Sequence, residues 1–306
     1  ASVPKLVQVQ HKVYESKSKG VAHVRIQNVN ELLLYVKQLQ VADVQALLQQ
    51  NGDAPSITHT PLTDEKCVLT VNVPNSALET CGVVLLCAQQ VDWISQLAGM
   101  PRQFALHMDG KYKLHHGGFI LITVGTTYLK LTDRNTLSNS FVPLAYLMKA
   151  AGESEIGATH LLRALNQVAI DVAGKPLEPG ETNSDHSDAF KLGYKNVFPN
   201  APHSQCYPHI VCKFRKGVYM KKTDPNFNAA LQHIAAIHFA KSNEMRDILS
   251  RQIGRQWDTW PGRPMITFWN EYCVAPWDNW SLGSFDCMLT TPNNNAQESW
   301  HKQILS

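Results

Sequence analysis

The hydrophobic and polar positions divide the chain into stretches with different periodicities. Between residues 67 and 148 the apolar residues occur in short runs separated by Pro, Gly and Asn clusters, a pattern typical of strands and turns. The last three runs follow one another closely and are expected to form an antiparallel meander. The predicted strands are Cys67–Val73, Gly82–Ala88, Phe104–Met108, Phe119–Val124 and Phe141–Met148.

After Gly152 the spacing changes to that of helices. Glu153, Ser154 and Glu155 provide acceptors for the first turn of a predicted helix. Its apolar stripe is Ala158, Leu161, Leu162, Leu165, Val168 and Ala169. A second helix is predicted over Ser187–Val197, and His203–Lys213 is predicted as a strand.

The two ends of the chain are also predicted to be partly helical. Residues 30–50 have roughly helical spacing within a Gln-rich beginning. From Asp224 onward the pattern is mostly helical, with Asp224-Pro225 starting one helix. The stripe of that helix is Phe227, Leu231, Ile234, His238 and Met245.

Composition narrows the classes of protein that fit. With 44% hydrophobic and 17% charged residues, the chain has enough apolar material for a buried core and is not a disordered protein. It contains no run of eighteen apolar residues, so no membrane span is predicted. Seven scattered cysteines without a C-x-x-C pair favour a reducing compartment, the cytosol or nucleus. Because the sequence begins at Ala1, we expect it to be part of a longer protein.

Asp109 is the first residue with candidate chemistry. It follows the apolar run that begins at Phe104 and precedes Gly110. On a strand, its side chain shares a face with those of Ala105 and His107. A buried carboxylate is unfavourable unless it meets a cation or a donor, so a metal ligand is one interpretation and an Asp-Gly turn is the other.

Further acids follow in chain order. Asp185, with Asp188 as a reserve, precedes a predicted helix, and either residue is also suited to cap it. Residues 177–183 contain Pro179 and no apolar run, so no strand is predicted before Asp185. Glu298 lies in a late, helix-like stretch. Acids in this order are compatible with a two-metal phosphoryl-transfer site, because several carboxylates hold the two hard cations of such a site.

Cys206 and His209 form a C-x-x-H pair, with His203 three residues earlier. On a strand the two histidines share one face and the cysteine points to the other. This geometry disfavours zinc and favours a role in packing. A Cys–His protease pair is a further interpretation, but two residues on one short segment are poorly placed to act as nucleophile and base.

Residues 213–222 carry five cations and no acid. They can follow a nucleic-acid backbone while Phe214 and Tyr219 stack on bases, or they form a solvated basic turn. The cations are Lys213, Arg215, Lys216, Lys221 and Lys222. Five later tryptophans, at 257, 260, 269, 277 and 280, are expected in the core of a helical region.

The order of these motifs resembles that of the Mutator-like transposases, a family whose catalytic domain has an RNase H-like fold with an inserted helical region. Four blocks of the sequence carry the resemblance. The third is the most specific, since an acid, a helix, Phe-Pro and C-x-x-H follow one another in the family's order. The blocks are Phe104–Lys113 with the strand up to Val124, Phe141–Tyr146 with Glu153 and Glu155, Ser184–His209, and Asn293–Ser299.

The resemblance implies a catalytic trio, Asp109, Asp185 and Glu298, that holds two Mg²⁺ or Mn²⁺ ions. It implies an α+β or α/β fold: an RNase H-like mixed sheet flanked by helices, with an all-helical insertion before the last acid. The activity would be cleavage and strand transfer of double-stranded DNA, at element ends and target, by a homo-oligomer in the nucleus, with no membrane involved.

The expected parts of the chain are a partly helical lead-in at 1–66, the first part of the catalytic core at 67–216, the helical insertion at 217–290, and a C-terminal core helix at 291–306.

Two other functions are open. A domesticated, inactive transposase would regulate transcription by binding DNA, and an RNase H-like nuclease would cut hybrids or single strands. The long insertion disfavours the nuclease.

Overall fold

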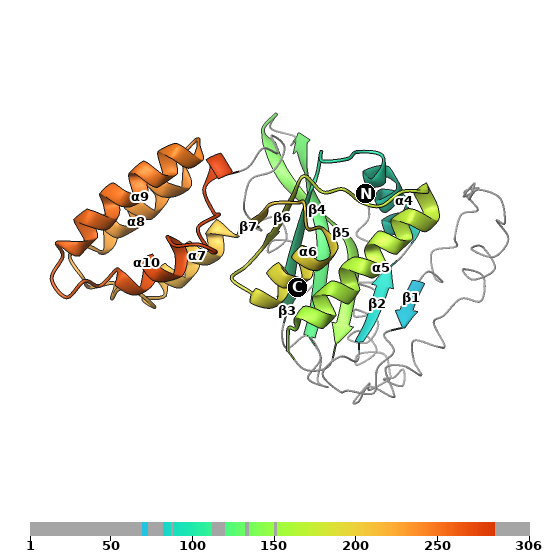
Figure 1. Cartoon of the computed structure of the whole chain (residues 1–306), viewed down its shortest axis with the longest axis horizontal. Coiled ribbons are helices and arrows are strands. Elements are labelled where there is room, and N and C mark those ends of the chain that lie inside the picture. The colour runs from blue at the N-terminus through green and yellow to red at the C-terminus, as the bar shows by residue number, and fades with distance from the viewer. Residues whose placement is uncertain are drawn as a thin grey trace.

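The computed structural model describes residues 69–72, 82–86, 88–111, 120–131, 135–149 and 152–284. Within them the chain is a mixed α/β protein built on a seven-stranded sheet of order β1-β2-β5-β4-β3-β6-β7 (Figure 1). The strands are β1 (Leu69–Asn72), β2 (Gly82–Leu86), β3 (Ala105–Lys111), β4 (Ile120–Leu131), β5 (Leu137–Lys149), β6 (Glu181–Ser184) and β7 (His203–Gln205).

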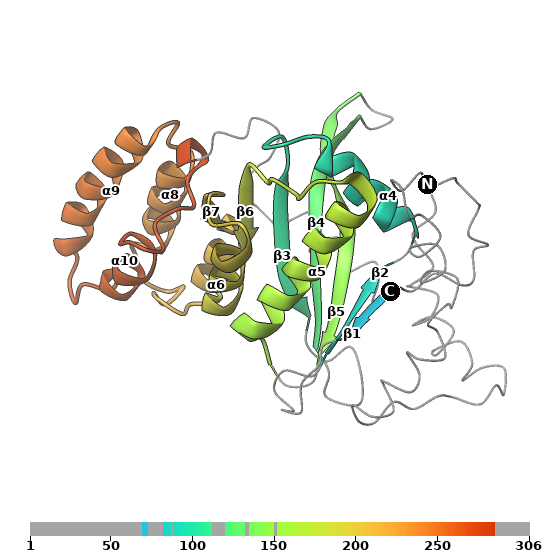
Figure 2. The ribbon, with the colours of Figure 1, turned by 45° about the vertical axis from the view of Figure 1, so that its right-hand side comes forward.

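The helices form two groups. Helices α4, α5 and α6 lie on one face of the sheet, and α7 to α10 gather beyond its β7 edge (Figure 2). Their bounds are α4 (Ala88–Ala98), α5 (Glu155–Ala173), α6 (Asp188–Val197), α7 (Tyr207–Arg215), α8 (Phe227–His238), α9 (Asn243–Asp258) and α10 (Ile266–Tyr272), followed by the short 3₁₀ helix η1 (Leu282–Ser284). Among the described residues, no helix combines the length and apolar character that a bilayer-spanning segment needs.

The predicted meander is confirmed. Strand β4 pairs antiparallel with both β3 and β5, and β5 continues the antiparallel pairing to β2. Strand β6 then returns on the other side of β3 and runs parallel to it, and β7 runs parallel to β6. Strands that run parallel need a crossover connection. Helix α5 crosses from β5 past β4 and β3 to β6, and α6 connects the neighbours β6 and β7.

The predicted helix after Gly152 is confirmed as α5. It begins where the backbone N–H of Gly157 donates to the Oγ of Ser154, and it ends at Gly174 in the left-handed conformation (φ 70°) that glycine adopts readily. All residues of the predicted stripe are buried. They pack with the apolar face of β3, including Leu106 and Met108, to form the larger hydrophobic core.

A second core joins α7 to α10. Trp257 and Trp280 are 3% and 1% exposed in it, which confirms the expected core role for these two tryptophans. The single stripe predicted from Phe227 to Met245 is wrong, because the chain turns after His238 and a new helix begins at Asn243. The Oγ of Ser242 caps this helix by accepting the N–H of Met245, and the Met245 side chain is exposed.

Two predictions around the β6–β7 edge are wrong. His203–Lys213 is a strand only as far as Gln205, and α7 follows with Pro208 in its first turn, where the fixed φ of proline suits a helix start. A strand that was not predicted, β6, begins at Glu181, just beyond Pro179, so that proline does not interrupt the ladder. Helix α4 was not predicted either.

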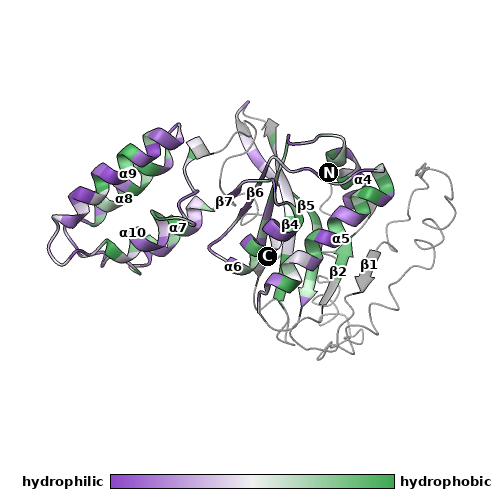
Figure 3. Ribbon diagram, viewed as in Figure 1, coloured by the Kyte–Doolittle hydropathy of each residue, from purple (hydrophilic) through white to green (hydrophobic). Residues whose placement is uncertain are grey.

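Strand β6 is buried although all of its residues are polar (Figure 3). Hydrogen bonds to the neighbouring strand satisfy part of its polar groups: the Oγ of Ser204 donates to Oε1 of Glu181 (2.6 Å), and Nδ2 of Asn183 donates to the Oγ of Ser204 (2.6 Å). Hydrophobic patterning therefore cannot reveal this strand. The predicted helical stretch at 30–50 and the acid Glu298 lie outside the described residues.

Candidate metal-binding site

The parallel pairing of β3 and β6 brings two aspartates together. In this pairing Met108 lies opposite Ser184. The residue that follows each of these two is an aspartate: Asp109, which still belongs to β3, and Asp185, which comes directly after β6. Because both strands run in the same direction, their carboxylates lie side by side at one end of the sheet. Asp109 is only 8% exposed and Asp185 is half-buried.

His209 joins the two aspartates through the next parallel strand. The backbone N–H of Cys206 donates to the carbonyl oxygen of Ser184 (2.8 Å), which places the start of α7 beside Asp185. His209 lies in the first turn of α7. One ring nitrogen of His209 and one carboxylate oxygen each of Asp109 and Asp185 lie within 4.8 Å of one another. Of the described residues, only these three form such a group of potential metal ligands.

This arrangement changes the interpretation of the C-x-x-H pair. The packing role rested on a strand from 203 to 213, but residues 207–215 are helical. Cys206 is 1% exposed and precedes the helix. The ring nitrogens of His203 lie 3.1 Å from the Oγ1 of Thr182 and 3.3 Å from the Oγ of Ser184. The helical turn therefore directs His209 alone toward the aspartates.

The electrostatics of Asp185 favour a bound cation. Burial first, and then the nearby carboxylates of Glu153 and Asp109, raise the pKa of Asp185 to about 6, with His209 and Lys213 opposing them. The Oδ1 of Asp185 is buried without a hydrogen-bond donor from any described residue. Two carboxylates and one imidazole are suitable ligands for a divalent ion such as Mn²⁺ or Mg²⁺. These residues therefore fit the metal that the resemblance implies.

Lys213 connects the aspartates to the helices beyond β7. It lies one turn after His209 on α7, and its Nζ donates to the hydroxyl of Tyr272 (3.0 Å) and to Oε1 of Glu271 (3.5 Å). The same oxygen of Glu271 lies 3.8 Å from Nδ1 of His186, the residue after Asp185. Side chains from α10 thus hold a lysine and a histidine next to the aspartates.

The structure places the other predicted site residues elsewhere or outside the described chain. Asp188 is exposed in the first turn of α6 and is not part of the ligand group. Glu298 lies outside the described residues. Phe214 is not available to stack on bases, as one of the two interpretations of residues 213–222 required, because its ring is fully buried in the second core. Four cations of the basic stretch, Arg215, Lys216, Lys221 and Lys222, are exposed.

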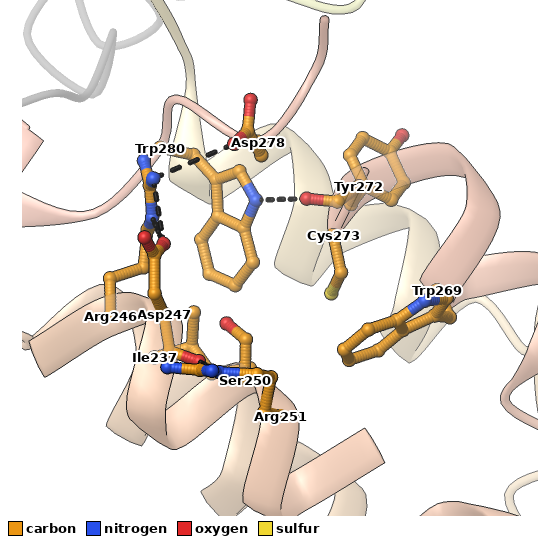
Figure 4. A pocket seen from close by; sticks show the side chains of 10 residues that line it. All are labelled: Ile237, Arg246, Asp247, Ser250, Arg251, Trp269, Tyr272, Cys273, Asp278 and Trp280. Atoms are coloured by element: carbon orange, nitrogen blue, oxygen red, sulfur yellow. Dashed lines mark hydrogen bonds and ion pairs between the residues drawn. The ribbon is translucent and has the colours of Figure 1, made fainter. Parts of the chain in front are cut away.

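A cavity of about 360 Å³ lies in the helical group, between α9, α10 and residues 273–280 (Figure 4). Its charged residues contact one another: Nη2 of Arg246 lies 2.9 Å from Asp247 and 3.6 Å from Asp278, and Nε of Arg251 donates to the carbonyl oxygen of Asp247 (3.1 Å). Burial raises the pKa of the Cys273 thiol to about 12, so the thiol stays protonated and is a poor nucleophile. The cavity thus brings together no catalytic constellation.

Comparison with known proteins gives no family for this chain. No model of a protein family matches it, and no curated protein matches its sequence. Function is therefore inferred from the geometry of the site and from the order of the motifs.

The imidazole of His209 gives a testable preference among metals. His209→Ala is expected to weaken Mn²⁺ binding by roughly 10-fold and Mg²⁺ binding less, because imidazole nitrogen suits transition metals better than Mg²⁺. Isothermal titration of the metal-free protein with each ion measures this. His160→Ala, on α5, serves as the control and should keep the parental affinities. An equal loss for both ions would contradict this preference, and an unchanged Mn²⁺ affinity would refute the assignment of His209 as a ligand.

Proposed function

We propose that this chain is the catalytic core of a DNA transposase that cleaves and joins DNA strands at Asp109 and Asp185 with divalent metal ions. The observation that carries the proposal is the convergence of these two carboxylates, distant in sequence, at the ends of adjacent parallel strands. The order of motifs, which resembles that of the Mutator-like transposases, supplies the reaction class. Glu298 is the proposed third acid.

We also propose that the sheet is RNase H-like. Three antiparallel strands (β5, β4, β3), then a helix, a strand parallel to β3, a second helix and a further parallel strand are consistent with the fold that the resemblance implies. The first acid lies on β3, where the sheet changes from antiparallel to parallel pairing, and the second follows its parallel neighbour β6. This arrangement supports the RNase H-like assignment, with α8 to α10 as the proposed helical insertion.

The proposed chemistry requires that the side chains hold ions and orient DNA. When bound, Mg²⁺ or Mn²⁺ ions lower the pKa of an attacking water or 3′-hydroxyl and stabilise the departing oxygen. Asp109, buried in the sheet, and Asp185 would hold the ions in a fixed place. The ammonium of Lys213, next to them, is placed to attract a phosphate of the DNA strand.

The exposed cations after α7 are the proposed DNA-binding surface. Lys221→Ala combined with Lys222→Ala is expected to weaken binding to any DNA duplex and to lower the salt dependence of log K by roughly 2, about one for each phosphate that these lysines neutralise. Fluorescence anisotropy at several salt concentrations measures this slope. Lys175→Ala is the control: Lys175 is exposed just after the C-terminal end of α5, and its loss should leave the slope unchanged. An unchanged slope in the double variant would exclude these lysines from the interface.

A cleavage and strand-transfer assay on labelled element-end DNA with Mg²⁺ or Mn²⁺ tests the proposed function. Metal-dependent cleavage followed by joining to a target supports the transposase. DNA binding without nicking would indicate a regulatory protein, and cutting of generic hybrids without joining would indicate a nuclease.

A further inference from the structure

Glu153 precedes α5 and reaches the end of strand β3. A β-carbon added at Gly110 would collide with Oε1 of Glu153, so this carboxylate occupies the space that a side chain at 110 would fill. Gly110 directly follows Asp109 on β3, and successive side chains of a strand point to opposite faces. Glu153 therefore approaches the end of β3 from the face covered by α5, and Asp109 projects from the other face.

Hydrogen bonds hold Glu153 in this place. The hydroxyl of Ser187, two residues after Asp185, donates to Oε2 of Glu153 (2.9 Å). The buried Nζ of Lys149 donates to the carbonyl oxygen of Gly152 (3.0 Å), which fixes the main chain just before Glu153. A carboxylate that is oriented in advance loses little conformational entropy when it binds a ligand.

These contacts place the Glu153 carboxylate beside both segments that carry the aspartates, because Gly110 follows Asp109 and Ser187 lies two residues after Asp185. Asp109 itself has an oxygen within 4.8 Å of one on Asp185. Neighbouring carboxylates repel one another, and a divalent cation bound between them removes this repulsion.

We propose that Glu153 is a further metal-binding carboxylate of this site, which approaches from the α5 side of the sheet and acts with Asp185 to hold Mg²⁺ or Mn²⁺. The inference rests on the proposed function for its choice of metal. It goes beyond the resemblance, which assigns metal binding to Asp109, Asp185 and Glu298 and gives Glu153 no such role.

Glu153→Gln tests the proposal, because it removes the charge and keeps both the size and an acceptor for Ser187. Isothermal titration of the metal-free variant with Mn²⁺ is expected to give an affinity at least about 10-fold below that of the parent. Glu155→Gln is the matched control, since Glu155 also belongs to the start of α5 but is exposed and accepts from Nδ2 of Asn196 (2.8 Å). It should bind Mn²⁺ as the parent does.

Gly110→Ala provides a second variant that leaves every acid in place. Its methyl group would displace the Glu153 carboxylate, so Mn²⁺ affinity should fall by a factor similar to that of Glu153→Gln. Because both changes act through the same carboxylate, adding Gly110→Ala to Glu153→Gln should cause little further loss. Thermal unfolding identifies any variant that is not folded.

The possible failures are distinguishable. If Glu153→Gln binds Mn²⁺ within about twofold of the parent, or Glu155→Gln loses as much affinity, Glu153 is not a ligand and the site at Asp109 and Asp185 still stands. If Gly110→Ala weakens binding equally in both backgrounds, the effect does not pass through Glu153 and the inference is overturned. If the parent binds no Mn²⁺, or Asp109→Asn binds it normally, the proposed function itself fails.

Discussion

Asp109→Asn and Asp185→Asn are each expected to lower the rate of metal-dependent DNA cleavage and joining by roughly 10³-fold or more. The carboxylates lie together at the ends of β3 and β6, and each holds part of the charge that binds the cations. Asparagine keeps the shape of aspartate but not its charge. The loss of several kcal/mol of transition-state stabilisation therefore appears in the rate rather than in the fold.

Asp188→Asn is the matched control for these two variants. Asp188 is exposed in the first turn of α6, outside the ligand group, so its rate should stay within about threefold of the parent. Single-turnover cleavage of labelled duplex DNA with Mn²⁺ measures all three. Full activity in Asp109→Asn or Asp185→Asn would show that the reaction does not use this site.

Asp185→Asn is also expected to stabilise the metal-free protein near pH 7.5. Burial and neighbouring carboxylates raise the pKa of Asp185 from 3.8 to about 6, so the ionised form is disfavoured in the folded state. The shift corresponds to at most about 3 kcal/mol, and partial solvent exposure lowers the expected gain to about 2 kcal/mol, or roughly 5 °C in Tm.

The sign of the pH dependence follows from the raised pKa. Well below pH 3.8 the carboxyl is protonated in both the folded and the unfolded state, so parent and variant should not differ through ionisation. The parent then loses stability relative to Asp185→Asn as the pH rises from about 4 to 6, and the difference is complete above that range. Thermal unfolding across this range in the presence of a chelator measures the difference. A variant less stable than the parent at pH 7.5 would contradict the account.

Bound metal should reverse this order of stability between the parent and Asp185→Asn. Saturating Mn²⁺ is expected to raise the Tm of the parent, because a ligand that binds only the folded state stabilises it. The variant, which lacks one ligand charge, should gain less. Equal gains in both proteins would place the ion elsewhere.

The sequence predicted those parts of the fold in which the spacing of the apolar residues identifies a strand or a helix. The meander from Phe104 to Met148 and helix α5 were predicted because their apolar residues alternate, or recur with helical spacing, over long stretches. Asp109 was identified from its place after an apolar run, Asp185 from its place before a predicted helix, and both from the resemblance. These features are local in the sequence.

The features that assemble the site are not local, and the sequence did not reveal them. Strand β6 is polar and is buried through hydrogen bonds to β7, so no apolar pattern marks it. The position of His209 depends on a helix that begins in the middle of a segment that looked like one strand. The role inferred for Glu153 depends on the missing side chain at Gly110, a contact between segments about forty residues apart.

Diffraction from crystals soaked in Mn²⁺, recorded with anomalous scattering, tests the central claim most directly. The account predicts an anomalous peak within coordination distance of the carboxylates of Asp109 and Asp185, with the His209 ring beside it. The peak should disappear in Asp185→Asn crystals treated in the same way. Strong Mn²⁺ peaks only at other places, or aspartates that point to separate surfaces, would contradict it.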